Sequence, residues 1–159
     1  MHLRVAGIEP ESVVDGPGVR FVVFLQGCGH HCHGCHNKQT WNKTGGYEMT
    51  TGEIFRAVRQ KELISGVTFS GGEPLGQARE LAQLAEMLKH TGYNLWCYTG
   101  YTWEEAQGNP VLPYLDVLVD GPFMESEKSL DLLFRGSRNQ RLIDVQESLK
   151  AGEVVLFKP

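Results

Sequence analysis

The sequence Gly27-Cys28-Gly29-His30-His31-Cys32-His33-Gly34-Cys35-His36-Asn37 contains three of the chain's four cysteines, spaced C-x3-C-x2-C. Thiolates this close together, separated by small or polar residues, can bind one soft metal centre. Their number is informative, because a structural zinc ion or an electron-transfer 4Fe-4S cluster uses four protein ligands. A 4Fe-4S cluster with three cysteine ligands leaves one iron open to another molecule. The spacing therefore favours such a cluster, with Cys28, Cys32 and Cys35 as its metal ligands.

Two other interpretations of the cysteine stretch remain open at this point. A zinc site could take its fourth ligand from a nearby histidine, since sites with three cysteines and one histidine are common. The candidates are His30, His31, His33 and His36. A disulfide framework is disfavoured, because the three cysteines are crowded, Cys97 lies far off in sequence, and nothing indicates secretion.

The composition indicates one soluble domain covering residues 1–159. A chain of about 150 residues buries roughly 68–70% of its unfolded surface, which is enough for a real core. The apolar content of 41% and the charged content of 21% are typical of globular proteins. A net charge of −4 gives no indication of nucleic-acid binding. The longest apolar run, 21–25, is too short to span a membrane, no signal peptide is visible, and free cysteines fit a reducing cytoplasm.

Hydrophobic patterning predicts strands that alternate with helices after the cysteine stretch. Thr50 and Glu53 have the spacing of a capping box, as do Thr102 and Glu105. The predicted strands are 2–8, 20–26, 66–70, 94–98, 116–119, 142–145 and 154–157, and the predicted helices are 51–61, 77–89, a short one after Thr102, and a turn or short helix at 146–150. This alternation favours an α/β fold with a mostly parallel sheet. A closed eight-fold barrel usually takes about 250 residues, so we expect an incomplete TIM-like barrel that is open along one side.

Polar motifs follow four of the predicted strands at the point where each strand ends. They are Cys28–Cys35, Gly71–Glu73, Tyr98–Tyr101 and Asp120. In parallel α/β folds the carboxyl ends of the strands share one edge of the sheet, where ligands bind. The sequence therefore predicts that these four motifs meet in one site.

The motifs together resemble a known family. They are Asp15-Gly16-Pro17-Gly18-x-Arg20, the cysteine stretch, Ser70-Gly71-Gly72-Glu73-Pro74, Tyr98-Thr99-Gly100-Tyr101, Val119-Asp120-Gly121 and Arg135-Gly136-Ser137-x-Asn139-Gln140. In this order they are similar to the activating enzymes of anaerobic, class III ribonucleoside-triphosphate reductases, within the radical S-adenosylmethionine (SAM) superfamily. The resemblance covers nearly the whole chain. It departs from the family at His36, where an aromatic residue is common, and in a longer tail after Gln140.

The resemblance implies a radical SAM core and a set of cofactor contacts. Cys28, Cys32 and Cys35 would hold three irons of a 4Fe-4S cluster, and SAM would chelate the fourth iron. The methionine end of SAM would lie at Gly71, Gly72 and Glu73, since glycines permit close approach and Glu73 or a backbone carbonyl can accept from an ammonium group. Gly34, Cys35 and His36 would lie along the nucleotide, and Asp120 would bind the ribose or the methionine.

The resemblance also implies a reaction and partners. A low-potential donor such as flavodoxin or ferredoxin would reduce the cluster, and reductive cleavage of SAM would form a 5′-deoxyadenosyl radical. That radical would take hydrogen from one glycine of the anaerobic ribonucleoside-triphosphate reductase, which could reach it through the open side of the barrel. The alternatives are an activase of another glycyl-radical enzyme, a small-molecule radical SAM enzyme, and a non-catalytic zinc or iron-sulfur module.

Several other residues have open or simpler interpretations. Asp15 and Arg20 fit either turn chemistry with a surface charge or a role near the cluster. Arg138 and Asn139 could bind SAM or the reductase. Cys97 is most simply a buried small hydrophobe, and His30, His31 and His33 are expected to be exposed loop residues.

Overall fold

The structure is a computed structural model that describes residues 1–159. It contains one seven-stranded sheet with the strand order β3-β1-β2-β4-β5-β6-β7. The strands are β1 (His2–Ser12), β2 (Arg20–Leu25), β3 (Tyr47–Thr50), β4 (Gly66–Gly71), β5 (Asn94–Tyr98), β6 (Val117–Asp120) and β7 (Arg141–Asp144). The α-helices are α1 (Thr51–Arg59), α2 (Ala78–Thr91), α3 (Trp103–Ala106) and α4 (Val145–Ala151). Four short 3-10 helices are η1 (Lys38–Thr40), η2 (Pro74–Gln77), η3 (Leu112–Tyr114) and η4 (Glu125–Glu127).

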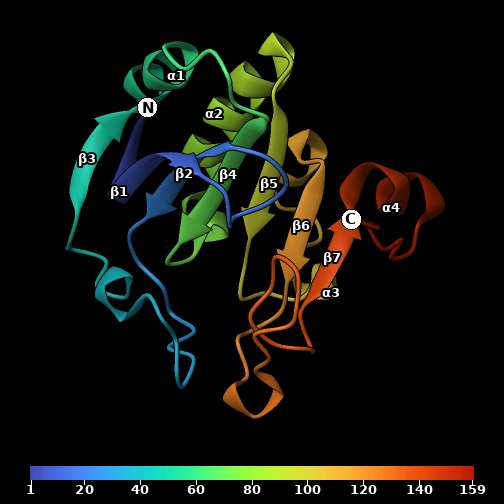
Figure 1. Ribbon diagram of the computed structural model, residues 1–159. Helices are drawn as coiled ribbons and strands as arrows, with labels where there is room; N and C mark the ends of the chain where they lie inside the picture. The colour runs from blue at the N-terminus through green and yellow to red at the C-terminus, as the bar shows by residue number, and fades with distance from the viewer.

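The centre of the sheet is parallel and its margins are antiparallel. Strands β2, β4, β5 and β6 pair in parallel, whereas β1, β3 and β7 pair antiparallel to their neighbours. Figure 1 shows the four central strands pointing to the same lower edge of the sheet. This arrangement confirms the predicted mostly parallel α/β sheet and brings four carboxyl ends together. The sheet is open, with β3 and β7 at its edges, and the partial barrel stays a prediction.

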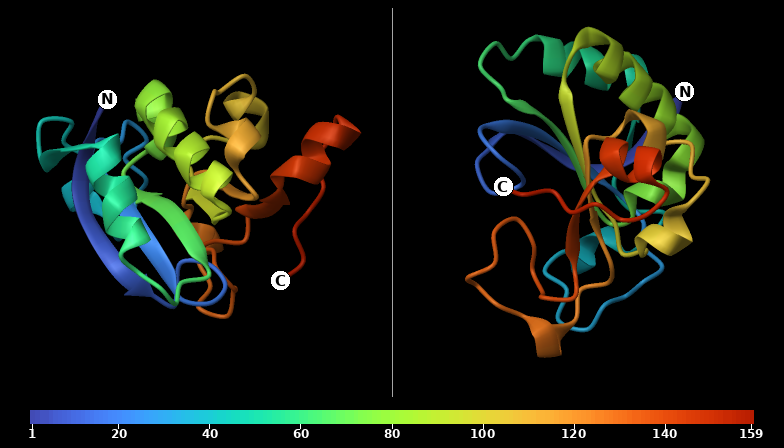
Figure 2. Two further views of the ribbon diagram at one scale, coloured as in Figure 1. Left: turned by 90° about the horizontal axis from the view of Figure 1, so that it is seen from above. Right: turned by 90° about the vertical axis from the view of Figure 1, so that its right-hand side faces the viewer.

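The main hydrophobic core lies between the sheet and the helices. Helix α1 packs on β1 and β3, and α2 packs on β1 and β5, so both cover the same face (Figure 2). Alternate residues of each strand point to that face, as the two-residue period of a strand requires. On the opposite face, Trp96 packs edge-on against Phe134 and Phe157, with ring centroids 5.3 and 5.4 Å apart. None of the helices has the length and apolarity that a bilayer crossing needs.

The local signals for helix ends are confirmed. Thr50 caps α1 and Thr102 caps α3, each through a complete capping box with the glutamate three residues later. Helix α2 ends at Gly92, which takes the left-handed conformation that glycine tolerates. The predicted helix boundaries are therefore close to the observed ones.

Two sequence predictions about strands need correction. Residues 47–50 form the edge strand β3, which was not predicted because Tyr47 and Glu48 are exposed and the segment has no apolar run. Residues 154–157 were predicted as a strand, but they form only an isolated bridge between Leu156 and Ile143. After the left-handed Gly152 at the end of α4, the tail meets the short edge strand β7 at that one point.

Arg20 lies at the amino end of the parallel strands, away from the cysteines. It is 1% exposed, and its guanidinium donates to Thr68 Oγ1 at 2.8 Å and to Asn94 Oδ1 at 2.9 Å. Thr68 Oγ1 in turn donates to the Asp15 carbonyl at 2.7 Å. Burial lowers the pKa of Arg20 to about 10, so it stays charged at neutral pH. Arg20 is therefore neither a surface charge nor near the cluster loop. The turn chemistry is confirmed, because its Nη1 donates to the Pro17 carbonyl at 3.3 Å, and the side chain also ties β2 to β4 and β5.

Candidate functional site

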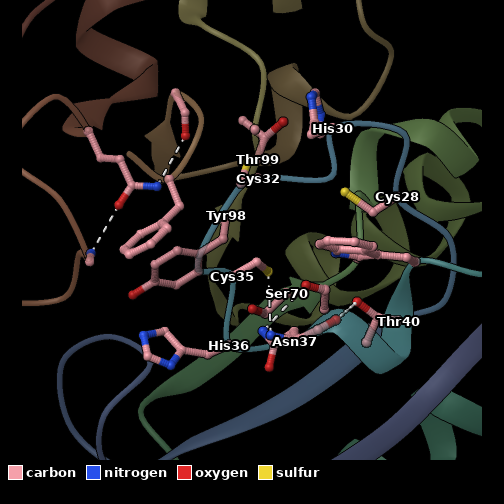
Figure 3. Close-up of a pocket in the computed structure, with 18 residues that line it drawn as sticks. Cys28, His30, Cys32, Cys35, His36, Asn37, Thr40, Ser70, Tyr98 and Thr99 are labelled. Atoms are coloured by element: carbon pink, nitrogen blue, oxygen red, sulfur yellow. Dashed lines mark hydrogen bonds between the residues drawn. The ribbon is translucent and has the colours of Figure 1, made fainter. Parts of the chain in front are cut away.

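A cavity lies at the carboxyl edge of the parallel strands, where the four predicted motifs meet. Its walls come from the loop after β2 and from the ends of β4, β5 and β6, with further residues from the segment before β7 (Figure 3). All three clustered cysteines line it. The remaining lining residues include His36, Asn37, Trp41, Ser70, Gly71, Gly72, Tyr98, Thr99, Gly100, Gly121, Phe123, Gly136 and Gln140.

The cysteines lie on an irregular loop, residues 26–37, which we call the cysteine loop. Its neck is closed by backbone hydrogen bonds, among them one from Cys28 N–H to the Trp41 carbonyl at 3.2 Å. Within the loop, Cys35 N–H donates to the Cys32 carbonyl at 3.1 Å, and Asn37 N–H donates to Cys35 Sγ at 3.4 Å. Burial raises the pKa of the Cys28 thiol, although the N–H groups of His30 and His31 oppose the rise. A backbone donor thus already faces the sulfur of Cys35.

Each of the four histidines of the cysteine loop contacts another side chain of the protein. His30 Nε2 lies 2.7 Å from Glu73 Oε1, and His33 Nε2 lies 3.0 Å from Glu125 Oε2. His31 stacks on Trp41 with ring centroids 4.5 Å apart, and the His36 ring meets another aromatic ring edge-on. No group of three or more His, Cys, Asp or Glu side chains converges on a position for a single ion. All four cysteines are free rather than disulfide-bonded.

Glu73 is a buried hydrogen-bond acceptor that joins three segments. It is 4% exposed, and its Oε1 accepts from His30 Nε2 and from Gly100 N–H, both at 2.7 Å. Thr99 Oγ1 donates to both carboxylate oxygens, and Leu75 N–H donates to Oε2 at 3.0 Å. A carboxylate offers about four acceptor positions, so this one is saturated by the protein itself. The hydrogen bond to Glu73 raises the pKa of His30, and His30 is half-buried rather than exposed as expected.

Gly71 and Gly72 bring the end of β4 against the start of the cysteine loop. Gly71 has φ +113°, a conformation that favours glycine. Gly72 N–H donates to the Leu25 carbonyl at 3.0 Å, and the following N–H, of Glu73, donates to the Gly27 carbonyl at 2.7 Å. Both glycines line the cavity, and the lack of a side chain leaves their backbone open to it. That they bind a cofactor stays a prediction.

Asp120 is buried and paired within the protein. It is 1% exposed, and it accepts from Trp103 N–H at 2.8 Å and from Arg141 Nη2 at 2.6 Å. Its hydrogen bond raises the pKa of Arg141 further above its ordinary range. The cavity is lined by the next residue, Gly121, and not by Asp120. Asp120 is thus not a surface carboxylate, and it holds α3 and β7 to the end of β6.

The other predicted site residues divide between the cavity wall and its surroundings. His36 lines the cavity, and its ring lies edge-on to Phe123 with centroids 5.8 Å apart. Gly34 has φ +77°, and a methyl group there would meet the Glu125 carboxyl carbon at 3.0 Å. Arg138 is exposed, and Asn139 Nδ2 donates to the Pro122 carbonyl at 2.7 Å. Gly34, Arg138 and Asn139 are therefore not part of the cavity wall, and Asn139 links the two ends of the segment 122–139.

Comparison with known proteins places this arrangement in a family. Residues 14–143 match the family described as a 4Fe-4S single cluster domain. The anaerobic ribonucleoside-triphosphate reductase-activating protein of Enterobacteria phage T4 is 38% identical over 143 residues, which are 85% of this chain and 90% of that protein. The chain belongs to this family of activating proteins. The activating protein of Vibrio cholerae is 37% identical over 141 residues, covering 82% of this chain and 91% of the relative.

The fold of this activating protein also has a counterpart among solved structures. The crystal structure of QueE from Escherichia coli superimposes with a TM-score of 0.51 at 22% sequence identity. The match covers 64% of this chain and 54% of QueE. At this identity the likeness concerns the fold alone.

The family match confirms the resemblance that the motifs indicated. It also supports an iron-sulfur cluster in preference to zinc, while the individual ligands stay predictions. The sequence did not single out Trp41 and Phe123, which line the cavity of the activating protein. Trp41 follows Cys35 by only six residues, so its nearness to the three clustered cysteines was the one signal in the sequence that could have identified it.

Glu73→Gln should destabilise the activating protein even before any cofactor is bound. A neutral amide has one acceptor oxygen, so at least one of the N–H donors now aimed at Glu73 would face an amide NH₂ group. We expect the free energy of unfolding of the cofactor-free chain to fall by about 1–3 kcal/mol. Equilibrium denaturation measures this change. Glu62→Gln, at an exposed position, is the matched control, and equal stability of the two variants would contradict the assignment.

Proposed function

We propose that this protein cleaves SAM reductively at a 4Fe-4S cluster and thereby generates the glycyl radical of an anaerobic ribonucleoside-triphosphate reductase. Cys28, Cys32 and Cys35 are the proposed cluster ligands. The observation that carries the proposal is that these three thiols line one cavity together with Gly71 and Gly72. When bound, the cluster would supply the electron that breaks a carbon–sulfur bond of SAM, so that the nucleoside fragment can take hydrogen from a glycine of the partner.

The donor set of the cavity fits such a cluster. Three cysteines line the cavity, and a 4Fe-4S cluster held by three cysteines leaves one iron open to a substrate. A backbone N–H group already faces the sulfur of Cys35, and donors of this kind tune cluster potentials. The three cysteines therefore fit the number of protein ligands that the proposed 4Fe-4S cluster needs, and the cavity supplies a backbone donor to one of their sulfurs.

In this proposal the methionine end of SAM lies at the turn after β4. Gly71 and Gly72 leave the backbone open there, and the carbonyl groups of the turn accept from the ammonium group. Glu73 is saturated by internal donors, so its role is to hold the cysteine loop against β5. Asp120 likewise supports the site through Arg141, and His36 lies along the nucleotide.

The partner enters, in this proposal, from the side on which the sheet is open. In this proposal the strands form a partial barrel. The cysteine loop and the segment 121–140 both contribute residues to the cavity, and they flank the same edge of the sheet in Figure 1. A backbone loop of the reductase could bring its glycine to the cavity there. Flavodoxin or ferredoxin is the proposed electron donor.

Anaerobic reconstitution tests the function. We expect about four irons per chain, formation of 5′-deoxyadenosine when dithionite and SAM are added, and a glycyl doublet in electron paramagnetic resonance once the reductase is present. If the reduced protein forms 5′-deoxyadenosine but the glycyl doublet arises only with another glycyl-radical enzyme, that enzyme replaces the reductase as the proposed partner. Stoichiometric zinc without iron after anaerobic preparation would favour the non-catalytic module.

A further inference from the structure

Trp41 has a buried indole N–H without a hydrogen-bond partner. Its Nε1 is one of only two buried side-chain nitrogen or oxygen atoms in the protein for which no partner is present. A buried donor without a partner is destabilising, and native proteins rarely tolerate one without a reason. Such an atom therefore points to an acceptor that joins the protein later.

The position of Trp41 limits what that acceptor can be. Its side chain lines the same cavity as Cys28, Cys32 and Cys35. Its carbonyl accepts from the N–H of Cys28 at 3.2 Å, so the residue is anchored directly beside the first cysteine. The chemistry expected in this cavity, under the proposed function, is a group rich in sulfur.

The orientation of the indole ring is held by the cysteine loop. The His31 ring stacks on the Trp41 indole with an interplanar angle of 11°. The backbone of His31 adopts φ +49°, an unusual value for a residue other than glycine. His31 lies between two of the three cysteines in sequence. The loop that carries the thiols therefore also fixes the tryptophan ring that faces the cavity.

We propose that the Trp41 indole N–H donates a hydrogen bond to a sulfur atom of the cluster. The inference rests on the proposed function and adds a positioning residue that belongs to neither the ligands nor the glycine turn. An N–H donor at sulfur stabilises the reduced, more negative cluster and so raises its reduction potential. Removing this donor should make the cluster harder to reduce, and the cysteines would still bind it.

Trp41→Phe removes the N–H and keeps an aromatic ring for His31 to stack on. We expect this variant to bind as much iron as the wild type, but its midpoint potential, titrated without SAM, should shift to a more negative value. Trp96→Phe is the matched control, because Trp96 packs with Phe134 and Phe157 on the opposite face from the main core. Its potential should equal that of the wild type, and an unshifted potential in Trp41→Phe with full iron content would overturn the inference.

A second measurement keeps the inference testable if Trp41→Phe fails to bind the cluster. The reduced wild type, labelled with indole-¹⁵N tryptophan and kept free of SAM, should show a ¹⁵N coupling and an exchangeable proton coupling to the cluster in pulsed electron paramagnetic resonance. The Trp96→Phe variant should retain both couplings. A wild-type cluster without them refutes this inference alone, whereas a wild type that binds no 4Fe-4S cluster refutes the proposed function as well. Couplings that arise only after SAM is added would assign the N–H to SAM and overturn the sulfur acceptor.

Discussion

Cys32→Ala should abolish cluster binding while the chain stays folded. Cys32 is partly exposed in the cysteine loop and lines the cavity, so the cofactor-free protein loses little packing. Two thiolates cannot hold a cluster that needs three. Substitution of a residue that only supports a metal ligand lowers metal affinity or activity by about 10–100-fold. Loss of a ligand itself should therefore reduce 5′-deoxyadenosine formation by more than about 100-fold. Bound iron, sulfide and 5′-deoxyadenosine are measured after anaerobic reconstitution.

The fourth cysteine supplies the control for this experiment. Cys97 is fully buried in the main core, where burial raises the pKa of its thiol well above the ordinary value. Its role as a small buried side chain was predicted. Cys97→Ala should cost stability of about 1 kcal/mol through the small cavity it leaves, with the cluster retained. Loss of iron from Cys97→Ala, or full iron in Cys32→Ala, would contradict the assignment of the ligands.

Gly72→Ala should damage both the fold and the site. A methyl group at Gly72 would run into the carbonyl group of Gly27 and would also lie 2.9 Å from the carbonyl oxygen of Leu25. Both obstacles are backbone atoms, which cannot rotate away as a side chain can. Relief requires the start of the cysteine loop to move, which would break the hydrogen bond from Glu73 N–H to Gly27. We expect a loss of about 1–3 kcal/mol in the free energy of unfolding, together with reduced iron binding.

Gly29→Ala tests whether the loss of stability in Gly72→Ala comes from the close contact with Gly27 and Leu25 or from any added methyl group at this end of the site. Gly29 lies in the same loop, has no neighbour within 4 Å of an added methyl group, and is not in the left-handed region. Its substitution should change stability by no more than about 0.5 kcal/mol. Chemical denaturation of both cofactor-free variants makes the comparison, and a Gly72→Ala chain as stable as Gly29→Ala would refute the close approach.

The parts of the fold that the sequence predicted are those with local signals. The capping residues Thr50 and Thr102, and the continuous apolar run of β2, depend on neighbours in sequence and were correctly interpreted. The antiparallel pairing of β1 and the edge strand β3 were not foreseen, because an apolar pattern does not encode the direction of a partner strand.

The roles of charged side chains were harder to predict from the sequence than the ends of helices. The position of Glu73 at the end of β4 was predictable, but its partners His30, Thr99 and Gly100 come from two other segments of the chain. Asp120 and Arg20 gave the same difficulty, because each is buried by contacts across the sheet. A sequence shows that a carboxylate follows a strand, whereas only the assembled fold shows how many donors already reach it.

The closed neck of the cysteine loop bears on how the protein is loaded. Backbone hydrogen bonds between protein groups alone join Gly27 to Thr40 and Cys28 to Trp41. The entropy of bringing the two ends of this loop together is therefore lost during folding and not during insertion of iron and sulfide. Iron and sulfide would then enter a loop whose neck is already held by hydrogen bonds of the protein itself.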